Sequence, residues 1–415
     1  MGSIPLKYGS SEIPFEYEAE RFQVLSGRTR STPLSDAEIN QKLDAPIDSP
    51  PIEDLIKPDE SVLLVVPDAT RQTASGQVVN LLVRRLIANG TAAFNIAVIF
   101  ATGIHRRVRA DEKESILTPF IAQRIKTLDH GPRDLASLVR LGETASGIPI
   151  ELNRAAKEYN RVVIIGGVTF HYFAGFTGGR KLVCPGLGSS KTINATHKLA
   201  FDCATGSRRE GVGPGLLDGN VVNESFISVA SVAAPAFAIS TIVDDRGDMV
   251  DLFCGHWITS HRAACERYAA EHTLEINEKR EIVIVSAGGH PHDINMIQAH
   301  KALENAANAC TEGGRIVLIA ECTEGLGRPD FLDWFEAENS EALASRLCER
   351  YQVNGQTAWS LLKKAERFKV KIVTSLDDLD ARKMRLQKVD TIPKLGDGEG
   401  YIIPDGAKYL VKAAG

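Results

Sequence analysis

The 415-residue chain lacks the cysteine patterns of a disulfide-rich or zinc-binding protein. Its seven cysteines are scattered, their number is odd, and no Cys-x-x-Cys occurs. Neither a disulfide framework nor a zinc knuckle is therefore indicated. We expect all the cysteines to be packing residues and the protein to reside in the reducing cytoplasm.

Signals for membranes and nucleic acids are also lacking. The N-terminus has no apolar core of the kind found in a signal peptide. The most apolar run, 226–242, contains three serines and Pro235, which favours a buried helix and strand over a membrane span. The formal net charge of −5 gives no reason to expect nucleic-acid binding. The sequence thus predicts neither a membrane nor a nucleic-acid partner.

The alternation of strands and helices along the chain is typical of an α/β protein. Short apolar runs that suit buried parallel strands lie at 62–66, 94–101, 162–165, 282–285 and 316–320, and helical spacing occurs at 78–87 and 296–310. A chain of this length exceeds one ordinary core. We expect two α/β domains with mostly parallel sheets, at 1–274 and 275–415. The glycine-rich loop 396–400 is expected to carry the C-terminal tail back to the first domain.

Polar, chemically reactive side chains follow the ends of several predicted strands. Asp68 and Arg71 follow the strand at 62–66, His105 follows the next strand, and His171 follows the third. The segment 288–290, Gly-Gly-His, follows a strand of the second domain. Ligand sites of open α/β sheets form outside the carboxyl ends of the strands. The sequence therefore predicts that these residues contribute to a site.

Each of these side chains has a functional and a structural interpretation. Arg71 suits bidentate recognition of a carboxylate, whereas Asp68 and Arg71 are equally compatible with a helix cap and an ion pair. His105 lies beside a glycine turn, where an imidazole can act as a base near neutral pH. A lone histidine is more often structural, and the strand-end position is what favours catalysis here.

The segment from His171 to His197 combines two imidazoles, Lys181 and a cluster of glycines. Backbone amides in such turns can cradle a phosphate. The segment is not a Walker loop, because no Gly-Lys-Ser/Thr occurs, and 186–188 is not a dinucleotide fingerprint. The alternative is a tight surface loop with a solvated lysine.

Gln298 and Lys301 are three residues apart on a predicted helix, so they share a face. An amide and an ammonium together suit a carboxylate, although a solvated helix face is the simpler interpretation of the pair alone. Trp359 is compatible with the wall of a site and equally with a core.

From Tyr8 to at least Asp377 the chain resembles the nickel-dependent lactate racemase family. The resemblance is carried by Asp68-Ala69-Thr70-Arg71, by the segment 171–181, and by the spacing of 105, 171, 181 and 197. It implies a racemase or epimerase of a 2-hydroxyacid, with its active site in the cleft between two α/β domains. It also implies a nickel-pincer nucleotide (nickel pyridinium-3,5-bisthiocarboxylic acid mononucleotide), which separate cofactor-synthesis proteins supply through transient contacts.

The roles that the resemblance implies fall on positions of this chain that match the motifs of the family. They are covalent cofactor attachment at Lys181, nickel ligation by His197, catalysis by His105 and His171, cofactor contacts from Asp68, Thr177, Gly178 and Gly179, and substrate contacts from Arg71, Gln298 and Lys301.

Three positions depart from the family pattern. Lactate-specific members carry tyrosine and serine where this chain has Ile297 and Ala299, so we expect a substrate larger than lactate. An apolar or sugar-acid side chain is favoured over a dicarboxylate, because His300, a possible cation, should point away from the face of Gln298. Thr196 stands where the family often has asparagine, so the surroundings of the nickel ligand differ.

Two other functions remain open at this point. A metal-dependent hydrolase could use His105, His171 and His197 as zinc ligands, but it leaves Lys181 without a role and has no evident general base. A non-catalytic protein could bind the pincer nucleotide, but it would not need the two catalytic histidines.

Overall fold

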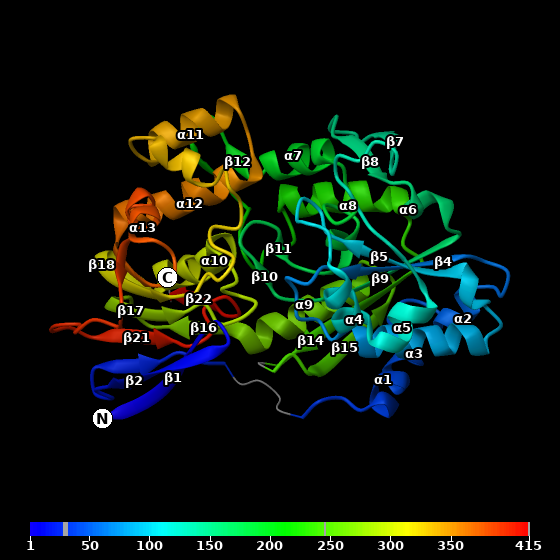
Figure 1. Ribbon diagram of the computed structural model, residues 1–415, viewed down its shortest axis with the longest axis horizontal. Coiled ribbons are helices and arrows are strands. Elements are labelled where there is room, and N and C mark those ends of the chain that lie inside the picture. The colour runs from blue at the N-terminus through cyan, green and yellow to red at the C-terminus, as the bar shows by residue number, and fades with distance from the viewer. Residues whose placement is uncertain (28–31, 245, 414–415) are drawn as a thin grey trace. The chain divides into compact units, whose positions relative to one another are not determined.

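The computed structural model describes residues 1–27, 32–244 and 246–413 (Figure 1). It divides into two compact units, each with its own mostly parallel sheet, and the predicted fold class is confirmed. Unit 1 comprises Met1–Arg28, Phe201–Arg209 and Glu271–Gly415; unit 2 comprises Thr29–Ala200 and Glu210–Ala270. The predicted first domain, 1–274, thus includes three segments that belong to unit 1: the N-terminal segment, 201–209 and 271–274.

Unit 2 is built on a six-stranded sheet in the order β15-β14-β9-β4-β5-β6. The strands are β4 (Val62–Pro67), β5 (Ile96–Ala101), β6 (Lys126–Leu128), β9 (Arg161–Gly167), β14 (Phe237–Val243) and β15 (Met249–Gly255). All neighbours pair in parallel except β14 and β15. The parallel strands therefore end at one edge, where the segments that follow them meet.

Both faces of this sheet are covered, which explains why its strands read as continuous apolar runs. Between residues 62 and 66 of β4, even-numbered side chains pack with α3 (Ser75–Ala88), and odd-numbered side chains pack with α8 (Val221–Ala233). Figure 1 shows these two helices on opposite faces of the sheet. The apolar run 226–242 forms the end of α8 and most of β14, as predicted. Among the residues that are described, no helix has the length and apolar character needed to cross a membrane.

The other elements of unit 2 are short and mostly follow the sheet strands. They are α1 (Asp36–Leu43), α2 (Ile52–Leu55), α4 (Ala110–Leu117), α5 (Pro119–Arg124), α6 (Ala155–Glu158), α7 (Ser190–Lys198), α9 (Thr259–His272), the 3-10 helices η1 (Ala93–Asn95) and η2 (Gly179–Leu182), and the strand pairs β7–β8 (Leu138–Glu143, Pro149–Asn153) and β10–β11 (Phe170–His171, Gly175–Phe176). The strand predicted at 94–101 begins at Ile96, because η1 turns Phe94 out to solvent.

Unit 1 has a second six-stranded sheet in the order β20-β19-β18-β17-β21-β3, parallel throughout. Its strands are β3 (Phe22–Val24), β17 (Arg280–Ser286), β18 (Cys310–Ile319), β19 (Lys369–Val373), β20 (Gln387–Val389) and β21 (Gly400–Ile403). The strand predicted at 316–320 begins earlier, because residues 310–315 continue the pairing with β17 across an irregular register.

Helices cover one face of this sheet, and a hairpin covers the other. The helices are α10 (Met296–Ala309), α11 (Ser340–Glu349), α12 (Val353–Arg367), α13 (Asp378–Lys383) and η3 (Leu332–Glu336); the hairpin is β1 (Gly2–Tyr8) with β2 (Ser11–Tyr17). In β17, Val283 and Val285 pack with the helices, while Ile282 and Ile284 pack with the hairpin and Leu6. The N-terminal residues therefore complete the core of unit 1.

The C-terminal tail stays within unit 1. After the loop at 396–400, β21 inserts between β17 and β3, and β22 (Leu410–Ala413) pairs in parallel with β16 (Thr273–Ile276). The tail thus pairs with strands from both ends of the chain, all of them in the same unit.

The cysteine prediction is wrong for two residues. Cys203, in the turn between β12 (Phe201–Asp202) and β13 (Ser207–Arg208), forms a disulfide with Cys348 of α11. The partners are 145 residues apart, so no local spacing marks the pair. The other five cysteines are free and buried, as expected of packing residues.

A thiol titration checks this assignment. Denatured protein should show five reactive thiols before reduction and seven after it, because only Cys203 and Cys348 are bonded. The variant Cys203→Ser, which frees Cys348, should show six in both states. Seven thiols in unreduced wild-type protein would contradict the disulfide.

Candidate active site

Three neighbouring strands of unit 2 deliver most of the predicted site residues. Strands β9, β4 and β5 are adjacent and parallel. Asp68 and Arg71 follow β4, His105 follows β5, and the segment that holds His171 and Lys181 follows β9. The sheet therefore brings these segments to one edge, as the strand-end argument predicts.

Asp68 and His105 form a close carboxylate–imidazole pair. The Asp68 Oδ2 atom lies 2.6 Å from Nδ1 of His105. The carboxylate is nearly buried, whereas 38% of the His105 side chain is exposed. A carboxylate can only accept, so Nδ1 carries the proton and the lone pair lies on Nε2. The pair therefore presents His105 as a base toward the exposed side.

The Asp68 carboxylate is held in its ionised form. Burial alone would raise its pKa, but the attraction and hydrogen bond of His105, together with the bond from Thr70, lower that pKa to about 2. Both the Thr70 amide (3.0 Å) and its hydroxyl (2.6 Å) donate to Oδ1. Oδ1 thus accepts hydrogen bonds from Thr70, and Oδ2 accepts the hydrogen bond from His105.

Arg71 is a half-buried cation near this pair. Burial lowers the pKa of its guanidinium, and the charge of Asp68 partly opposes that shift. Its guanidinium makes no hydrogen bond or ion pair with any residue in the described part of the chain. An arginine in this state is suited to receive an anionic group such as a carboxylate.

His171 is held in the opposite tautomer to His105. It ends β10 and is buried. Its Nδ1 atom accepts hydrogen bonds from the amides of Ala174 (3.2 Å) and Phe173 (3.5 Å). A nitrogen that accepts carries no proton, so the neutral ring holds its proton on Nε2. His105 therefore has a lone pair on Nε2, whereas His171 has a proton on Nε2.

His171, His197 and Lys181 gather around the ring of Phe173. The ring centroid of Phe173 lies 4.5 Å from that of His171 and 5.1 Å from that of His197. The Lys181 ammonium lies 5.6 Å from the Phe173 centroid and 5.0 Å from that of Phe226 on α8. Three of the predicted residues therefore share one partly apolar environment.

His197 is prepared to donate a lone pair. Its Nδ1 atom lies 2.8 Å from the carbonyl oxygen of Ile193, one turn earlier on α7, so Nδ1–H donates and the lone pair lies on Nε2. Burial and the charge of Lys181 lower the pKa of His197 to about 3. The ring is therefore neutral, as a metal ligand must be. The hydroxyl of Thr196 donates back into α7.

The turn before Lys181 is tightly folded. The Thr177 hydroxyl donates to the carbonyl of Gly167 (2.8 Å) and accepts from the amide of Thr169 (2.8 Å). Gly178 and Gly179 follow with φ of 75° and 52°, values that favour glycine. A Cβ on Gly179 would also lie 2.5 Å from the ring of His261. Glycine is therefore required there for conformation and for space.

Gln298 and Lys301 lie in unit 1, on α10. The Lys301 ammonium donates to the Gln298 side-chain oxygen at 2.5 Å, so the predicted shared face is present. His300 points elsewhere: burial lowers its pKa to about 4, and its Nδ1–H donates to the carbonyl of Ile297 (2.6 Å). Trp359 lies in the core of unit 1 with its ring edge-on to Phe201, 4.9 Å between centroids. Of its two interpretations, the core residue is the one observed.

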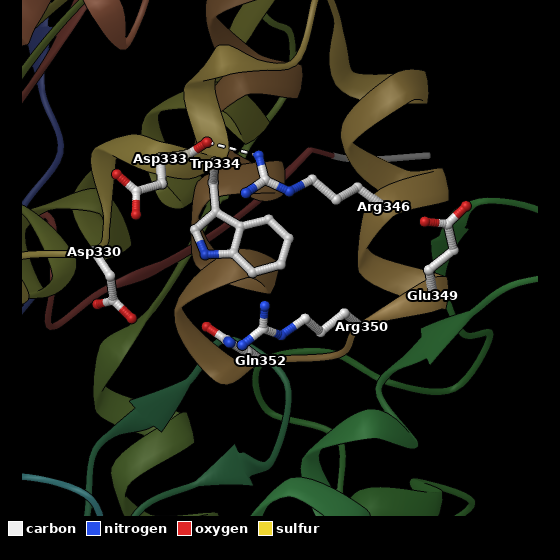
Figure 2. Close-up of a pocket in the computed structure, with 7 residues that line it drawn as sticks. All are labelled: Asp330, Asp333, Trp334, Arg346, Glu349, Arg350 and Gln352. Carbon is white, nitrogen blue, oxygen red and sulfur yellow. Dashed lines mark hydrogen bonds between the residues drawn. The ribbon is translucent and has the colours of Figure 1, made fainter.

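A surface cavity of about 350 Å³ lies in unit 1 and is lined by none of the predicted residues. Figure 2 shows its indole, Trp334, between the guanidinium groups of Arg346 and Arg350. Arg346 lies 4.8 Å from the Trp334 ring and donates to the carbonyl of Asp333 (2.7 Å). The residues that line this cavity all belong to unit 1.

Sequence reasoning missed two polar residues beside the predicted site. Arg180 precedes Lys181, and its guanidinium is buried among the carbonyls of the turn. His261, on α9, is buried against Gly179 and matched no motif.

Comparison with known proteins shows the family to which the chain belongs. Residues 8–207 match the family model of the lactate racemase N-terminal domain, and residues 276–394 match that of the lactate racemase C-terminal domain. The lactate racemase of Thermoanaerobacterium thermosaccharolyticum is 28% identical over 355 residues, which are 84% of this chain and 82% of that protein. The lactate racemase of Lactiplantibacillus plantarum is 30% identical over 335 residues, 80% and 77% of the two chains.

Solved structures agree with the sequence matches. The lactate racemase apoprotein from Thermoanaerobacterium thermosaccharolyticum superposes with a TM-score of 0.89 at 26% identity, over 99% of this chain and 100% of that one. A Thermotoga maritima protein shares the fold, with a TM-score of 0.72 at 20% identity over 93% and 100% of the two chains. Both family models, both relatives and the fold point the same way: the chain belongs to the lactate racemase family and is an isomerase.

Proposed function

We propose that this protein racemises or epimerises a 2-hydroxyacid by reversible hydride transfer, with a nickel-pincer nucleotide attached to Lys181. The observation that carries the proposal is the gathering of His171, Lys181 and His197 around Phe173. A lysine for attachment, a neutral imidazole for nickel and a proton-bearing imidazole thus lie within one small environment.

The chemistry of the substrate explains why such a cofactor is needed. The α-hydrogen of a hydroxycarboxylate is a very weak acid, because the neighbouring carboxylate is already negative. Removal of a proton from that carbon would be slow. When bound, the nickel-pincer nucleotide supplies a reversible acceptor for the hydrogen as hydride, so the protein itself has only to move the hydroxyl proton.

The two histidines are arranged for that proton. His105 has a lone pair on Nε2 and an ionised Asp68 behind it, which stabilises the imidazolium formed when the hydroxyl proton arrives. His171 holds its proton on Nε2. A racemase must handle a proton on each face of a planar 2-oxo acid, and we assign one histidine to each face.

The residues fit the cofactor as well as the substrate. Nε2 of His197 is the available ligand atom, and the glycine turn directly precedes Lys181 in the chain. The hydrolase alternative needs three protein ligands around one metal. Within the described ranges, no group of three His, Cys, Asp or Glu side chains is placed to hold a metal ion. That geometry supports a metal that arrives with an organic ligand of its own.

For the substrate we propose that Arg71, Gln298 and Lys301 hold the carboxylate and oxygen, which is mainly positioning work. We attribute the selection of substrate size to Ile297, which is half-buried, because Ala299 is buried in the core of unit 1. Because His300 is buried and its pKa is lowered, it offers no charge to a second carboxylate. We therefore propose a 2-hydroxyacid with an apolar or sugar-acid side chain larger than that of lactate.

Cofactor-loaded protein tests this choice. Specificity constants should be higher for a longer aliphatic 2-hydroxyacid or gluconate than for lactate, with malate lowest, measured by chiral chromatography from single enantiomers. If lactate is preferred by tenfold, about 1.4 kcal/mol of transition-state binding, the size argument fails and the racemase proposal remains. If no 2-hydroxyacid is interconverted although Lys181 carries the nucleotide, the racemase proposal itself fails and storage is favoured.

A further inference from the structure

Arg180 is a buried cation that has no carboxylate partner among the residues that the structure describes. Its side chain is 2% exposed, and no carboxylate in the described ranges lies within ion-pair distance of it. Burial lowers the pKa of its guanidinium to about 10, so it remains charged at neutral pH. Burying an unpaired charge is costly unless other polar groups satisfy it.

Backbone carbonyls of the turn before Lys181 accept from both of its Nη atoms, whereas its buried Nε atom has no hydrogen-bond partner among the described residues. The Nη2 atom donates to the carbonyl of Ala174 at 2.6 Å, and Nη1 lies 3.5 Å from the carbonyl of Gly178. These carbonyls lie on either side of β11. The guanidinium therefore links residues 174 and 178, which both lie in the segment between His171 and Lys181.

His261 holds the same turn from α9. Its Nε2–H donates to the carbonyl of Thr177 at 2.8 Å, and its ring fills the space beside Gly179. Burial and the charge of Arg180 lower the pKa of His261 to about 3, so its ring stays neutral at neutral pH. Three contacts, with the carbonyls of residues 174, 177 and 178, thus fix a turn that its glycines would otherwise leave free.

The contact continues along one face of α9. Cys265 follows His261 by one helical turn, and its sulfur lies 3.5 Å from Nε2 of that ring. Tyr268, a further turn on, packs edge-to-face on Phe170, 5.2 Å between centroids. Phe170 directly precedes His171 in β10. This face of α9 therefore braces the segment at both His171 and the turn before Lys181.

We infer that Arg180 and His261 are positioning residues that clamp the turn from which Lys181 projects, so that its amine is aimed at the incoming nickel-pincer nucleotide. The inference rests on the proposed function, because it presumes attachment at Lys181. Orientation of a reacting group accounts for a large share of rate in well-ordered sites. The amide of Lys181 itself bonds to the carbonyl of Gly178 at 3.1 Å, which links the clamped turn directly to the lysine.

Two matched variants test the clamp. His261→Gln keeps an amide N–H near the position of Nε2, whereas His261→Leu keeps volume and loses the donor. In protein made together with the cofactor-synthesis proteins, intact-protein mass should show the rate of nucleotide attachment reduced about tenfold in His261→Leu and little changed in His261→Gln. Both should melt at similar temperatures, since both lose the same ring packing.

Hydrogen–deuterium exchange of the cofactor-free protein gives an independent readout. Amides 174–182 should exchange faster in His261→Leu, and in Arg180→Met, than in His261→Gln. The clamp would be overturned if His261→Leu showed the attachment rate and the amide exchange of wild type. It would also be overturned if both His261 variants lost attachment in proportion to their fall in melting temperature. If His261→Leu does not fold, the exchange in Arg180→Met decides. Wild-type protein that never acquires the nucleotide would instead refute the proposed function.

Discussion

Lys181→Ala is expected to abolish nickel retention and racemisation while the chain stays folded. Lys181 lies in η2 and is half-buried, with its ammonium over the rings of the core residues Phe173 and Phe226, and it is not one of the apolar side chains that form that core. Its removal therefore leaves the packing of the sheet intact but deletes the only proposed covalent link to the nucleotide. Intact-protein mass, nickel content and turnover of a single enantiomer measure the three effects together.

Two further variants separate attachment from ligation. Lys191→Ala, a lysine on α7 whose side chain is 73% exposed, should retain adduct, nickel and turnover. His197→Ala should keep the organic adduct but lose nickel, because it removes a ligand and not the link, and it should lose more nickel than His105→Ala does. Stoichiometric nickel and activity in Lys181→Ala would refute attachment at this residue. Equal nickel in the two histidine variants would refute the ligand assignment.

The sequence was most informative where the structure is local. The strand of residues 62–66 is buried on both faces, and its continuous run of apolar residues indicates that burial directly. Its carboxyl end could therefore be placed, and with it Asp68 and Arg71. Helix α10 was predicted to within one residue for the same reason, because its apolar spacing follows its buried face.

Contacts between distant residues could not be predicted in this way. The Arg180–His261 contact spans 81 residues, and the bond of Arg208 on β13 to Glu304 on α10 spans 96. Arg208 belongs to the segment 201–209, whose local pattern gives no sign that it packs in unit 1. Apolar periodicity records that a face is buried but not which partner covers it.

The tautomers of the two histidines likewise could not be predicted from the sequence. His105 and His171 were both predicted as proton handlers, but a histidine in a sequence has no preferred protonated nitrogen. For His105 an aspartate 37 residues earlier sets the tautomer, and for His171 the amides two and three residues later set it. This difference is what gives each histidine a separate chemical task.

Removal of either histidine should therefore be severe. His105→Ala and His171→Ala are each expected to lower kcat on the order of 10²–10⁴-fold, the usual effect of losing general acid–base catalysis. Both directions of interconversion should suffer, because each turnover uses a proton handler on each face of the 2-oxo acid. His256→Ala, which removes an exposed imidazole, is the matched control and should leave turnover unchanged. Near-full turnover in both catalytic variants would refute the two-histidine mechanism.

Asp68→Asn should be nearly as severe as His105→Ala, although it leaves the imidazole in place. The Thr70 amide and hydroxyl both donate to Oδ1, so the asparagine oxygen must face Thr70 and its amide nitrogen must face His105. Nδ1 of His105 would then have to accept, which moves the ring proton to Nε2 and removes the base.

Because the pKa of Asp68 is lowered to about 2, its carboxylate is ionised from acid to neutral pH, and the negative charge is lost only as pH falls through that value. Any change of the wild-type kcat with pH near neutrality must therefore come from the titration of another group. The measurement is kcat against pH for wild type, Asp68→Asn and His105→Ala with equal cofactor loading. A variant Asp68→Asn that keeps more than a tenth of wild-type kcat would show that the carboxylate does not set the tautomer of His105.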